Sequence, residues 1–222
     1  MLQLTRAGTV FAGSMEDLEH LRVEFGRQNG MHLRGLLEPG LAQIIRRHLE
    51  PDRFLDNRHA GGTELCLADH HTAGLLHFLT NNADLFRIIR QITGCRRIGC
   101  FGGRVYRMLP GNDHHSLWHS DALEHILIGL SINLSQEAYS GGAFQLRDRR
   151  TGRMVCELPN TGFGDGILFR IAPDLEHRNT PLAGAVAKTA FAGWFQSRPE
   201  SRFLLGKGDA AGAEPLQAPS GH

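Results

Sequence analysis

Apolar residues in the first part of the chain recur at helical spacing. Leu18, Leu21 and Phe25 are three and four positions apart, and they follow Ser14, a residue type that favours the start of a helix. Three further segments combine this pattern with a helix-start or helix-end signal, at about 39–49, 69–79 and 82–94. The pattern therefore predicts four helices before residue 95.

After Gly94 the pattern changes to short apolar runs that are separated by glycine-rich turns. Runs of this kind are typical of strands. We predict eight strands, at 98–101, 104–109, 117–121, 125–134, 143–147, 154–158, 167–171 and 188–197. Many short strands indicate a jelly roll or a related two-sheet barrel, and helices followed by strands predict an α+β fold in which helices buttress one sheet.

Composition excludes several classes of protein. The formal net charge of +1 lacks the basic surplus of a general nucleic-acid binder. We find neither a secretory signal nor a run approaching the roughly 18 apolar residues of a membrane span. The four cysteines form no CxxC pair, which argues against a zinc ribbon or a redox motif. We therefore expect a cytoplasmic protein without a nucleic-acid or membrane partner; its oligomeric state stays open.

The clearest chemical signal is the segment from Trp118 to Asp121. Residues i and i+2 of a strand point to the same face, so His119 and Asp121 would direct their side chains at one point. His177, which follows a glycine turn and a predicted strand, is the best third ligand. Two histidines and one carboxylate on one face are the facial triad of non-haem Fe(II) oxygenases.

Two alternative functions stay open. If the strand began early, His115 would share a face with His119 and Asp121, which would suit a zinc hydrolase. The turn residues at 110–113 favour a loop there instead. The second alternative is a non-catalytic, cupin-like module with a degenerate or structural metal.

Other features surround the triad in a fixed order. They are a strand with Tyr106 that ends in a Pro-Gly turn at 110–111, a strand at 131–134, the pair Gly141-Gly142, Pro181 four residues after His177, and Lys188 six residues before Trp194. In this order, from Phe101 to Gln196, the chain resembles the 2-oxoglutarate- and Fe(II)-dependent dioxygenases, particularly the prolyl-4-hydroxylase-like branch. The resemblance implies a double-stranded β-helix core (96–198) with helical support (14–95) in one oxygenase domain (1–205). A tail at 206–222, rich in Gly, Ala and Pro, is expected to be disordered.

The resemblance also implies roles for individual residues. His119, Asp121 and His177 would hold Fe(II), and Lys188 would pair with the distal carboxylate of 2-oxoglutarate. Lys188 is one of only two lysines among the 24 basic residues. Family members that use Arg at this place often add a Ser two residues later. The corresponding residue here is Ala190, so the Tyr106 hydroxyl would assist instead.

The implied reaction is hydroxylation of an unactivated C–H bond by dioxygen, with ascorbate as a candidate reductant. Related halogenases lack the acidic ligand, so the presence of Asp121 favours hydroxylation. The substrate would be a peptidyl-proline, another amino acid or a small metabolite. The sequence does not choose among them.

Overall fold

The computed structural model describes residues 1–49, 53–59, 62–111, 114–159 and 161–199, and the predicted tail at 206–222 lies outside them. The helices are α1 (Met15–Gln28), α2 (Pro39–Arg47), α3 (His70–Thr80) and α4 (Ala83–Thr93). The strands are β1 (Leu2–Thr5), β2 (Gly8–Phe11), β3 (Gly30–Leu33), β4 (Phe54–His59), β5 (Gly62–Leu67), β6 (Cys100–Met108), β7 (His115–Ser116), β8 (Ile126–Asn133), β9 (Ser140–Gly141), β10 (Phe144–Asp148), β11 (Met154–Leu158), β12 (Gly166–Arg170), β13 (Leu175–Asn179), β14 (Leu182–Ala183) and β15 (Lys188–Gln196).

The four predicted helices are confirmed, and the termini of two of them follow the local capping rules. The Ser14 hydroxyl accepts a hydrogen bond from the backbone N–H of Asp17, whose carboxylate accepts one from the Ser14 N–H, so α1 begins with a capping box. Helix α4 begins at the cap Asn82 and ends at Gly94, which has a left-handed φ of 67°. None of the helices in the described part of the chain is long and apolar enough to cross a membrane.

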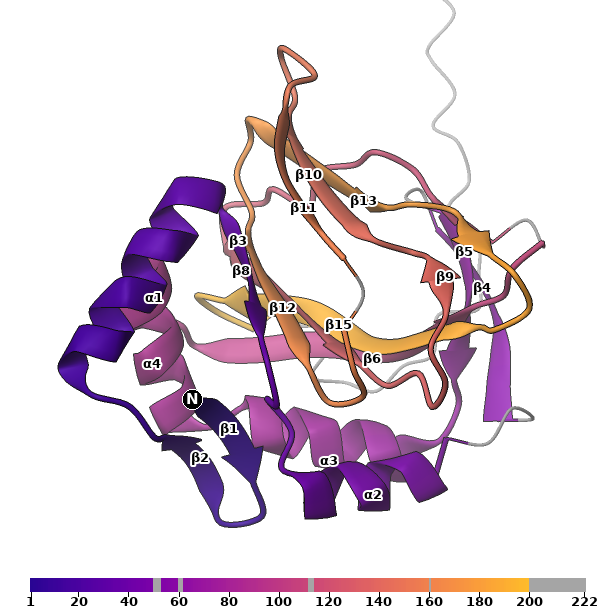
Figure 1. The fold of residues 1–222 in the computed structure, drawn as a ribbon, viewed down its shortest axis with the longest axis horizontal. Helices are drawn as coiled ribbons and strands as arrows, with labels where there is room; N and C mark the ends of the chain where they lie inside the picture. The colour runs from indigo at the N-terminus through magenta and orange to yellow at the C-terminus, as the bar shows by residue number, and fades with distance from the viewer. Residues whose placement is uncertain (50–52, 60–61, 112–113, 160, 200–222) are drawn as a thin grey trace, which may run out of the picture.

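Two antiparallel sheets form the predicted jelly roll. The larger sheet has the order β3-β12-β8-β15-β6-β5-β4, with β7 paired to β5, and the smaller sheet has the order β11-β10-β13. Figure 1 shows the smaller sheet over one face of the larger sheet, with the helices against its other face. The α+β architecture with helices buttressing one sheet is therefore confirmed.

Alternation along the two central strands separates a helix-facing side from the interior of the barrel. Phe191 and Phe195 of β15 are fully buried in the core that includes the helices, as is Val105 of β6. The alternate side chains face the interior; they are Lys188, Ala190, Ala192 and Trp194 on β15, and Arg104, Tyr106 and Met108 on β6. The helices therefore fix which residues of these strands can take part in a site between the sheets.

One predicted boundary between strands is wrong. The segments predicted at 98–101 and 104–109 form the single strand β6, because Gly102 and Gly103 lie in the ladder opposite Trp194 and Gly193. A Cβ on Gly103 would lie only 2.7 Å from the carbonyl oxygen of Ala192. These glycines permit a close approach of two backbones and do not turn the chain.

The strand predicted at 117–121 is also wrong. Only His119 pairs there, through an isolated bridge in which His119 and His177 each donate a backbone N–H to the other's carbonyl oxygen, at 3.1 and 2.9 Å. The preceding strand β7 pairs with β5, and the chain then crosses from β5 to β13. The single bridge at His119 is therefore the pairing that the described segment 117–121 makes.

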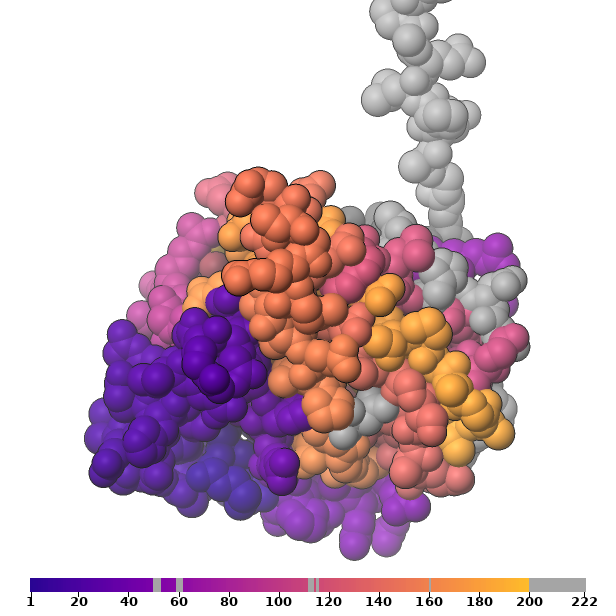
Figure 2. Space-filling model, turned by 45° about the horizontal axis from the view of Figure 1, so that its top comes forward, coloured from indigo at the N-terminus to yellow at the C-terminus, as the bar shows by residue number. Residues whose placement is uncertain are grey.

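The sequence pattern also fails to reveal the strands before residue 70. Strand β3 extends the larger sheet beside β12, and the β4–β5 hairpin extends it beside β6. Figure 2 shows the indigo and purple N-terminal residues directly against the orange residues of the barrel. The β5 strand buries the charged Glu64 and leaves Leu65 half-buried, so the sequence of β5 lacks the alternation of apolar and polar residues that marks a strand. The domain boundaries 1–205, 14–95 and 96–198 stay predictions.

Two glycine substitutions should have opposite effects on stability. A Cβ on Gly193 would collide with the carbonyl oxygen of Gly102, whereas one on the exposed Gly74 of α3 would meet no atom within 4 Å. We expect Gly193→Ala to destabilise the protein by about 1–3 kcal/mol and Gly74→Ala to stabilise it by about 0.5–1 kcal/mol. Urea denaturation of both variants checks this, and equal midpoints would contradict the strand register.

Candidate metal centre

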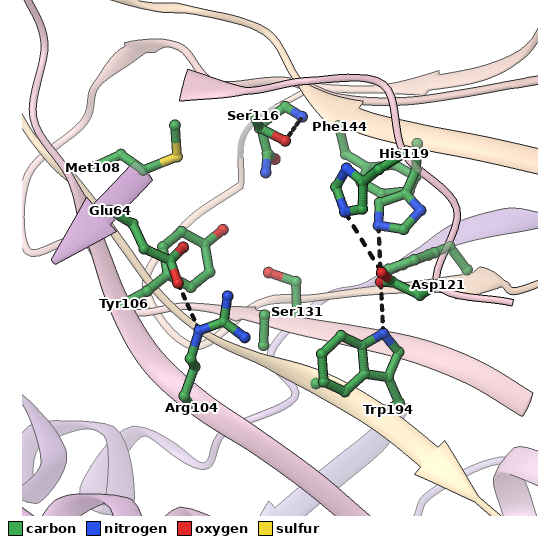
Figure 3. Close-up of a pocket in the computed structure, with 15 residues that line it drawn as sticks. Glu64, Arg104, Tyr106, Met108, Ser116, His119, Asp121, Ser131, Phe144 and Trp194 are labelled. Carbon is green, nitrogen blue, oxygen red and sulfur yellow. Dashed lines mark hydrogen bonds and ion pairs between the residues drawn. The ribbon is translucent and has the colours of Figure 1, made fainter. Parts of the chain in front are cut away.

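Three side chains converge at one end of the space between the sheets. His119 lies in the segment after β7, His177 lies on β13, and Asp121 follows His119 by two residues. The Asp121 oxygens lie 3.7 Å from Nε2 of His119 and 3.4 Å from Nε2 of His177, and one ligand atom from each residue falls within 4.8 Å of the others. Figure 3 shows both imidazoles facing the carboxylate.

Hydrogen bonds fix the orientation of two of these groups. Nδ1 of His119 donates to the carbonyl oxygen of Leu117 at 2.7 Å, which leaves the lone pair on Nε2 facing Asp121. The indole Nε1 of Trp194 donates to the Asp121 carboxylate at 2.8 Å. Such bonds from the far side of a ligand are what orient it for a metal.

The ionisation of Asp121 also suits a cation. Burial alone would raise the pKa of this carboxyl group. The hydrogen bond and charge of His177, the charge of His119 and the hydrogen bond from Trp194 outweigh burial and hold the pKa below its ordinary value. Asp121 is therefore an anion at neutral pH.

The three residues fit a divalent transition metal. Two imidazole nitrogens and one carboxylate oxygen suit Fe(II), Mn(II) or Zn(II), and a set of three ligands leaves positions open for other molecules. Phe144 and Phe169 pack around His177, with ring centroids 5.9 and 4.9 Å from the imidazole, so the site has apolar walls that limit access of water.

A cavity extends from the triad between the sheets. The space that it encloses, with its open mouth included, is about 700 Å³. Its lining residues are Glu64, Arg104, Tyr106, Met108, Ser116, His119, Asp121, Ser131, Phe144, Phe169, His177, Asn179, Ala192, Gly193 and Trp194. Tyr106 and the triad thus line one cavity, and Lys188 lines a smaller one.

Lys188 is buried at the closed end of the barrel. Its Nζ donates to Asn179 Oδ1 at 2.6 Å and to the Gly142 carbonyl oxygen at 2.8 Å. Among the described residues no carboxylate forms an ion pair with it. Burial lowers the pKa of Lys188 to about 7. The ammonium is thus solvated by two neutral oxygens and has no anionic partner there.

The two cavities are neighbours. Ser131 of β8 lines both of them, and it forms a hydrogen bond with the Tyr106 side chain. Burial raises the pKa of Tyr106 far above its ordinary value, so its hydroxyl stays protonated. Tyr106 therefore lies between the triad and Lys188, where it can donate a hydrogen bond.

Trp118 is neither a wall of the cavity nor a residue of the core. Its ring stacks with the guanidinium groups of Arg147 and Arg178, which lie 4.1 and 4.5 Å from the ring centroid. Those arginines face outward from β10 and β13, because the inner face holds Phe144 and His177. Trp118 therefore anchors the His119 segment to the outside of the smaller sheet.

Some residues of the cavity are not predicted from the sequence. Glu64 has no motif around it, and only the pairing of β5 with β6 brings it to the cavity beside Arg104. The sequence favours solvated positions for the strand arginines Arg104, Arg107 and Arg147, with a pocket for an acidic or peptide substrate as the alternative, and of these three Arg104 lines the cavity. The side chain of His115 lies outside the described residues, so the alternative site with His115 stays a hypothesis.

The fold can be compared with that of known proteins. No protein-family model and no curated protein matches the sequence. The structure of a Pseudomonas putida prolyl-4-hydroxylase is 14% identical, with a TM-score of 0.59, and the match covers 82% of this chain and 100% of that one. An oxidoreductase of the 2OG-Fe(II) oxygenase family from Burkholderia pseudomallei is 18% identical, with a TM-score of 0.58 and coverage of 89% and 95%.

A third match widens the range of reactions. The non-heme alpha ketoglutarate dependent epimerase SnoN from nogalamycin biosynthesis is 16% identical, with a TM-score of 0.59 and coverage of 92% and 94%. At such identities the likeness establishes the fold. The chain therefore has the fold of the 2-oxoglutarate- and Fe(II)-dependent oxygenases, with prolyl hydroxylases among its structural neighbours, as the sequence resemblance predicts.

The stacking of Trp118 generates a prediction about metal affinity. Replacing Trp118 by Ala removes both arginine contacts, so the segment carrying His119 loses its anchor to the smaller sheet. Changes behind a metal ligand typically weaken binding by about 10–100-fold, and we expect about tenfold for Mn(II). Trp118→Phe, which keeps an aromatic face, should stay within about threefold of the parent. Titration followed by electron paramagnetic resonance measures this; equal affinity in all three proteins would refute the anchor.

Proposed function

We propose that this protein is an Fe(II)- and 2-oxoglutarate-dependent dioxygenase that hydroxylates an unactivated C–H bond. The observation that carries the proposal is the convergence of His119, Asp121 and His177 on one point of the jelly-roll interior. The cavity at that point adjoins a second one that holds a buried lysine. A metal site and a buried cation that line two adjoining cavities suit a dicarboxylate that chelates a metal.

In this proposal the protein positions the reactants and the metal activates dioxygen. His119, Asp121 and His177 would hold Fe(II). The hydrogen bond that His119 donates to Leu117 and the one that Asp121 accepts from Trp194 keep two of these ligands in place before any metal arrives. Holding the ligands in advance lowers the cost of assembling the site.

Lys188 would hold the distal carboxylate of 2-oxoglutarate. The cosubstrate would run from the triad past Ser131 and the small Ala190 and Ala192, which leave room along the floor of the barrel. The protonated Tyr106 hydroxyl would donate a second hydrogen bond to this carboxylate. Asn179 and the Gly142 carbonyl oxygen solvate the ammonium until the carboxylate arrives.

The structural neighbours leave the substrate class open. One is a Trichoplax adhaerens prolyl hydroxylase in complex with a peptide fragment of hypoxia inducible factor, and another is SnoN in complex with Fe3+, alpha ketoglutarate and nogalamycin RO. We propose hydroxylation of a peptidyl-proline, an amino acid or a small metabolite, with ascorbate as an accessory reductant. A screen of such compounds for products 16 Da heavier, with Fe(II), 2-oxoglutarate and dioxygen, tests the reaction type.

Metal and cosubstrate binding test the proposed centre directly. Anaerobic addition of Fe(II) and 2-oxoglutarate should give a visible metal-to-ligand charge-transfer band, because the cosubstrate chelates the metal. His119→Ala and His177→Ala should each abolish the band while circular dichroism shows an intact fold. A colourless parent protein that binds zinc and hydrolyses esters would favour the zinc hydrolase. Bound metal without consumption of 2-oxoglutarate would favour a non-catalytic module.

Lys188 makes the affinity for 2-oxoglutarate dependent on pH. With a pKa of about 7 in the empty protein, Lys188 is charged below pH 7 and neutral above it. Binding the dianion requires the charged form, so the affinity should be constant at low pH and fall by up to about tenfold per unit above pH 7. Isothermal titration of 2-oxoglutarate into the Mn(II)-loaded protein from pH 6 to 9 measures this.

Two variants of Lys188 separate its charge from other effects of pH. Lys188→Met should weaken 2-oxoglutarate by at least about tenfold at pH 6.5 and remove the loss above pH 7, while Mn(II) affinity stays the same. Lys188→Arg should also bind poorly, since its longer fork does not fit a closed cavity. An unchanged affinity in Lys188→Met would place the cation that binds 2-oxoglutarate elsewhere.

A further inference from the structure

A second charged group lies on the opposite wall of the cavity from the triad. Nε of Arg104 on β6 donates to Oε1 of Glu64 on β5 at 2.6 Å, and Figure 3 shows this pair across the cavity from the imidazoles, with Ser131 between them. Among the described residues that line the cavity, Arg104 is the only lysine or arginine. The wall facing the candidate metal centre therefore carries a guanidinium whose charge is paired with the Glu64 carboxylate.

The two members of this pair differ in exposure. The side chain of Arg104 is 38% exposed and that of Glu64 is 8% exposed, so the guanidinium is the more accessible member of a pair that lines the cavity. Glu64 also accepts a hydrogen bond from Nδ2 of Asn57. The bond to Nε fixes the plane of a guanidinium fork, and a fixed planar fork is suited to a carboxylate. A pair that served only to join β5 to β6 would not need to line the cavity.

Neighbouring residues leave space for a ligand in front of Arg104. The residue opposite it on β15 is Ala192, which also lines the cavity, as does Gly193. A Cβ at Gly193 would collide with the backbone of β6, so only glycine fits at that position. The space beside the guanidinium depends on the small side chain of Ala192 opposite it.

From this geometry we propose that the primary substrate is a small organic acid or amino acid whose free carboxylate binds Arg104. The inference rests on the proposed function and names its substrate class. Lys188 would hold the carboxylate of the cosubstrate at the closed end, and Arg104 would hold the substrate carboxylate near the triad. The cavity lined by the triad and Arg104 lies between the sheets, and the small residues Ala192 and Gly193 in its lining suit a small ligand beside the cosubstrate.

Matched pairs of an acid and its primary amide test the proposal, because each pair differs mainly in charge. The probes are propionate and propionamide, benzoate and benzamide, and N-acetylglycine and its amide. Ligand-observed saturation-transfer NMR measures their binding to the full chain, loaded with Mn(II) and saturated with 2-oxoglutarate so that the Lys188 site is filled. We expect each acid to bind the parent at least about tenfold more tightly than its amide.

Three variants locate that preference. Arg104→Gln should abolish it without changing the affinity for 2-oxoglutarate. The double variant Glu64→Gln/Arg104→Gln should do the same and removes the risk that an unpaired Glu64 unfolds the protein. Arg107→Gln is the control, since Arg107 lies on the same strand but bonds Thr189 and stacks on Phe54 outside the cavity; it should keep the preference.

Several outcomes would overturn the inference. Equal binding of acids and amides by the parent would do so, as would a preference that persists in the double variant. Tenfold weaker 2-oxoglutarate binding in Arg104→Gln would show that Arg104 holds the cosubstrate instead. An acetylated and amidated peptide with one aspartate, if it bound more tightly than N-acetylglycine, would show that the acid comes from a peptide side chain. Failure of the parent to bind 2-oxoglutarate would count against the proposed function, and the same samples report it separately.

Discussion

The candidate metal centre depends on one short backbone contact. His119 and His177 exchange two hydrogen bonds across an isolated bridge, and this exchange is what brings a segment outside any strand against β13. The ring centroids of the two histidines are consequently 4.3 Å apart. Asp121, two residues further, then reaches both imidazoles. Without the bridge, the ligands would belong to two independent parts of the chain.

The residues around this bridge contact both faces of the smaller sheet. Trp118 packs on the outer face against two arginines, and the next residue, His119, points to the inner face. Trp194 reaches Asp121 from β15 on the opposite sheet. The triad is thus tied to both sheets, so that the distance between the sheets also fixes the position of the carboxylate. A site built in this way on strands keeps its geometry before a metal binds.

The sequence predicts those parts of the molecule that depend on local rules. Capping at Ser14 and Asn82 needs only neighbouring residues, and the helices end where these rules place them. The triad is predicted because i and i+2 spacing survives even where the expected strand shrinks to a single bridge. Glu64 could not be predicted, since its place beside Arg104, 40 positions away, depends on the pairing of β5 with β6. Gly102 and Gly103 mislead for a related reason: only the opposing strand shows that they serve close approach.

The interior of the barrel places its two cations in different electrostatic environments, and this difference bears on what each can bind. Lys188 is buried, donates hydrogen bonds to two neutral oxygens, lies 6.0 Å from the centroid of the Tyr139 ring and has a pKa lowered to about 7, so its charge is costly until an anion arrives. Arg104 is more exposed, is partly neutralised by Glu64 and keeps its proton at any physiological pH. A buried lysine of this kind favours an anion of the right length, because two neutral oxygens compensate only part of its desolvation. A more exposed guanidinium selects a ligand less by its charge and more by its shape, because its planar fork matches a planar carboxylate. Under the proposed function, Lys188 would hold the carboxylate of the cosubstrate, and Arg104 would hold the carboxylate of the substrate.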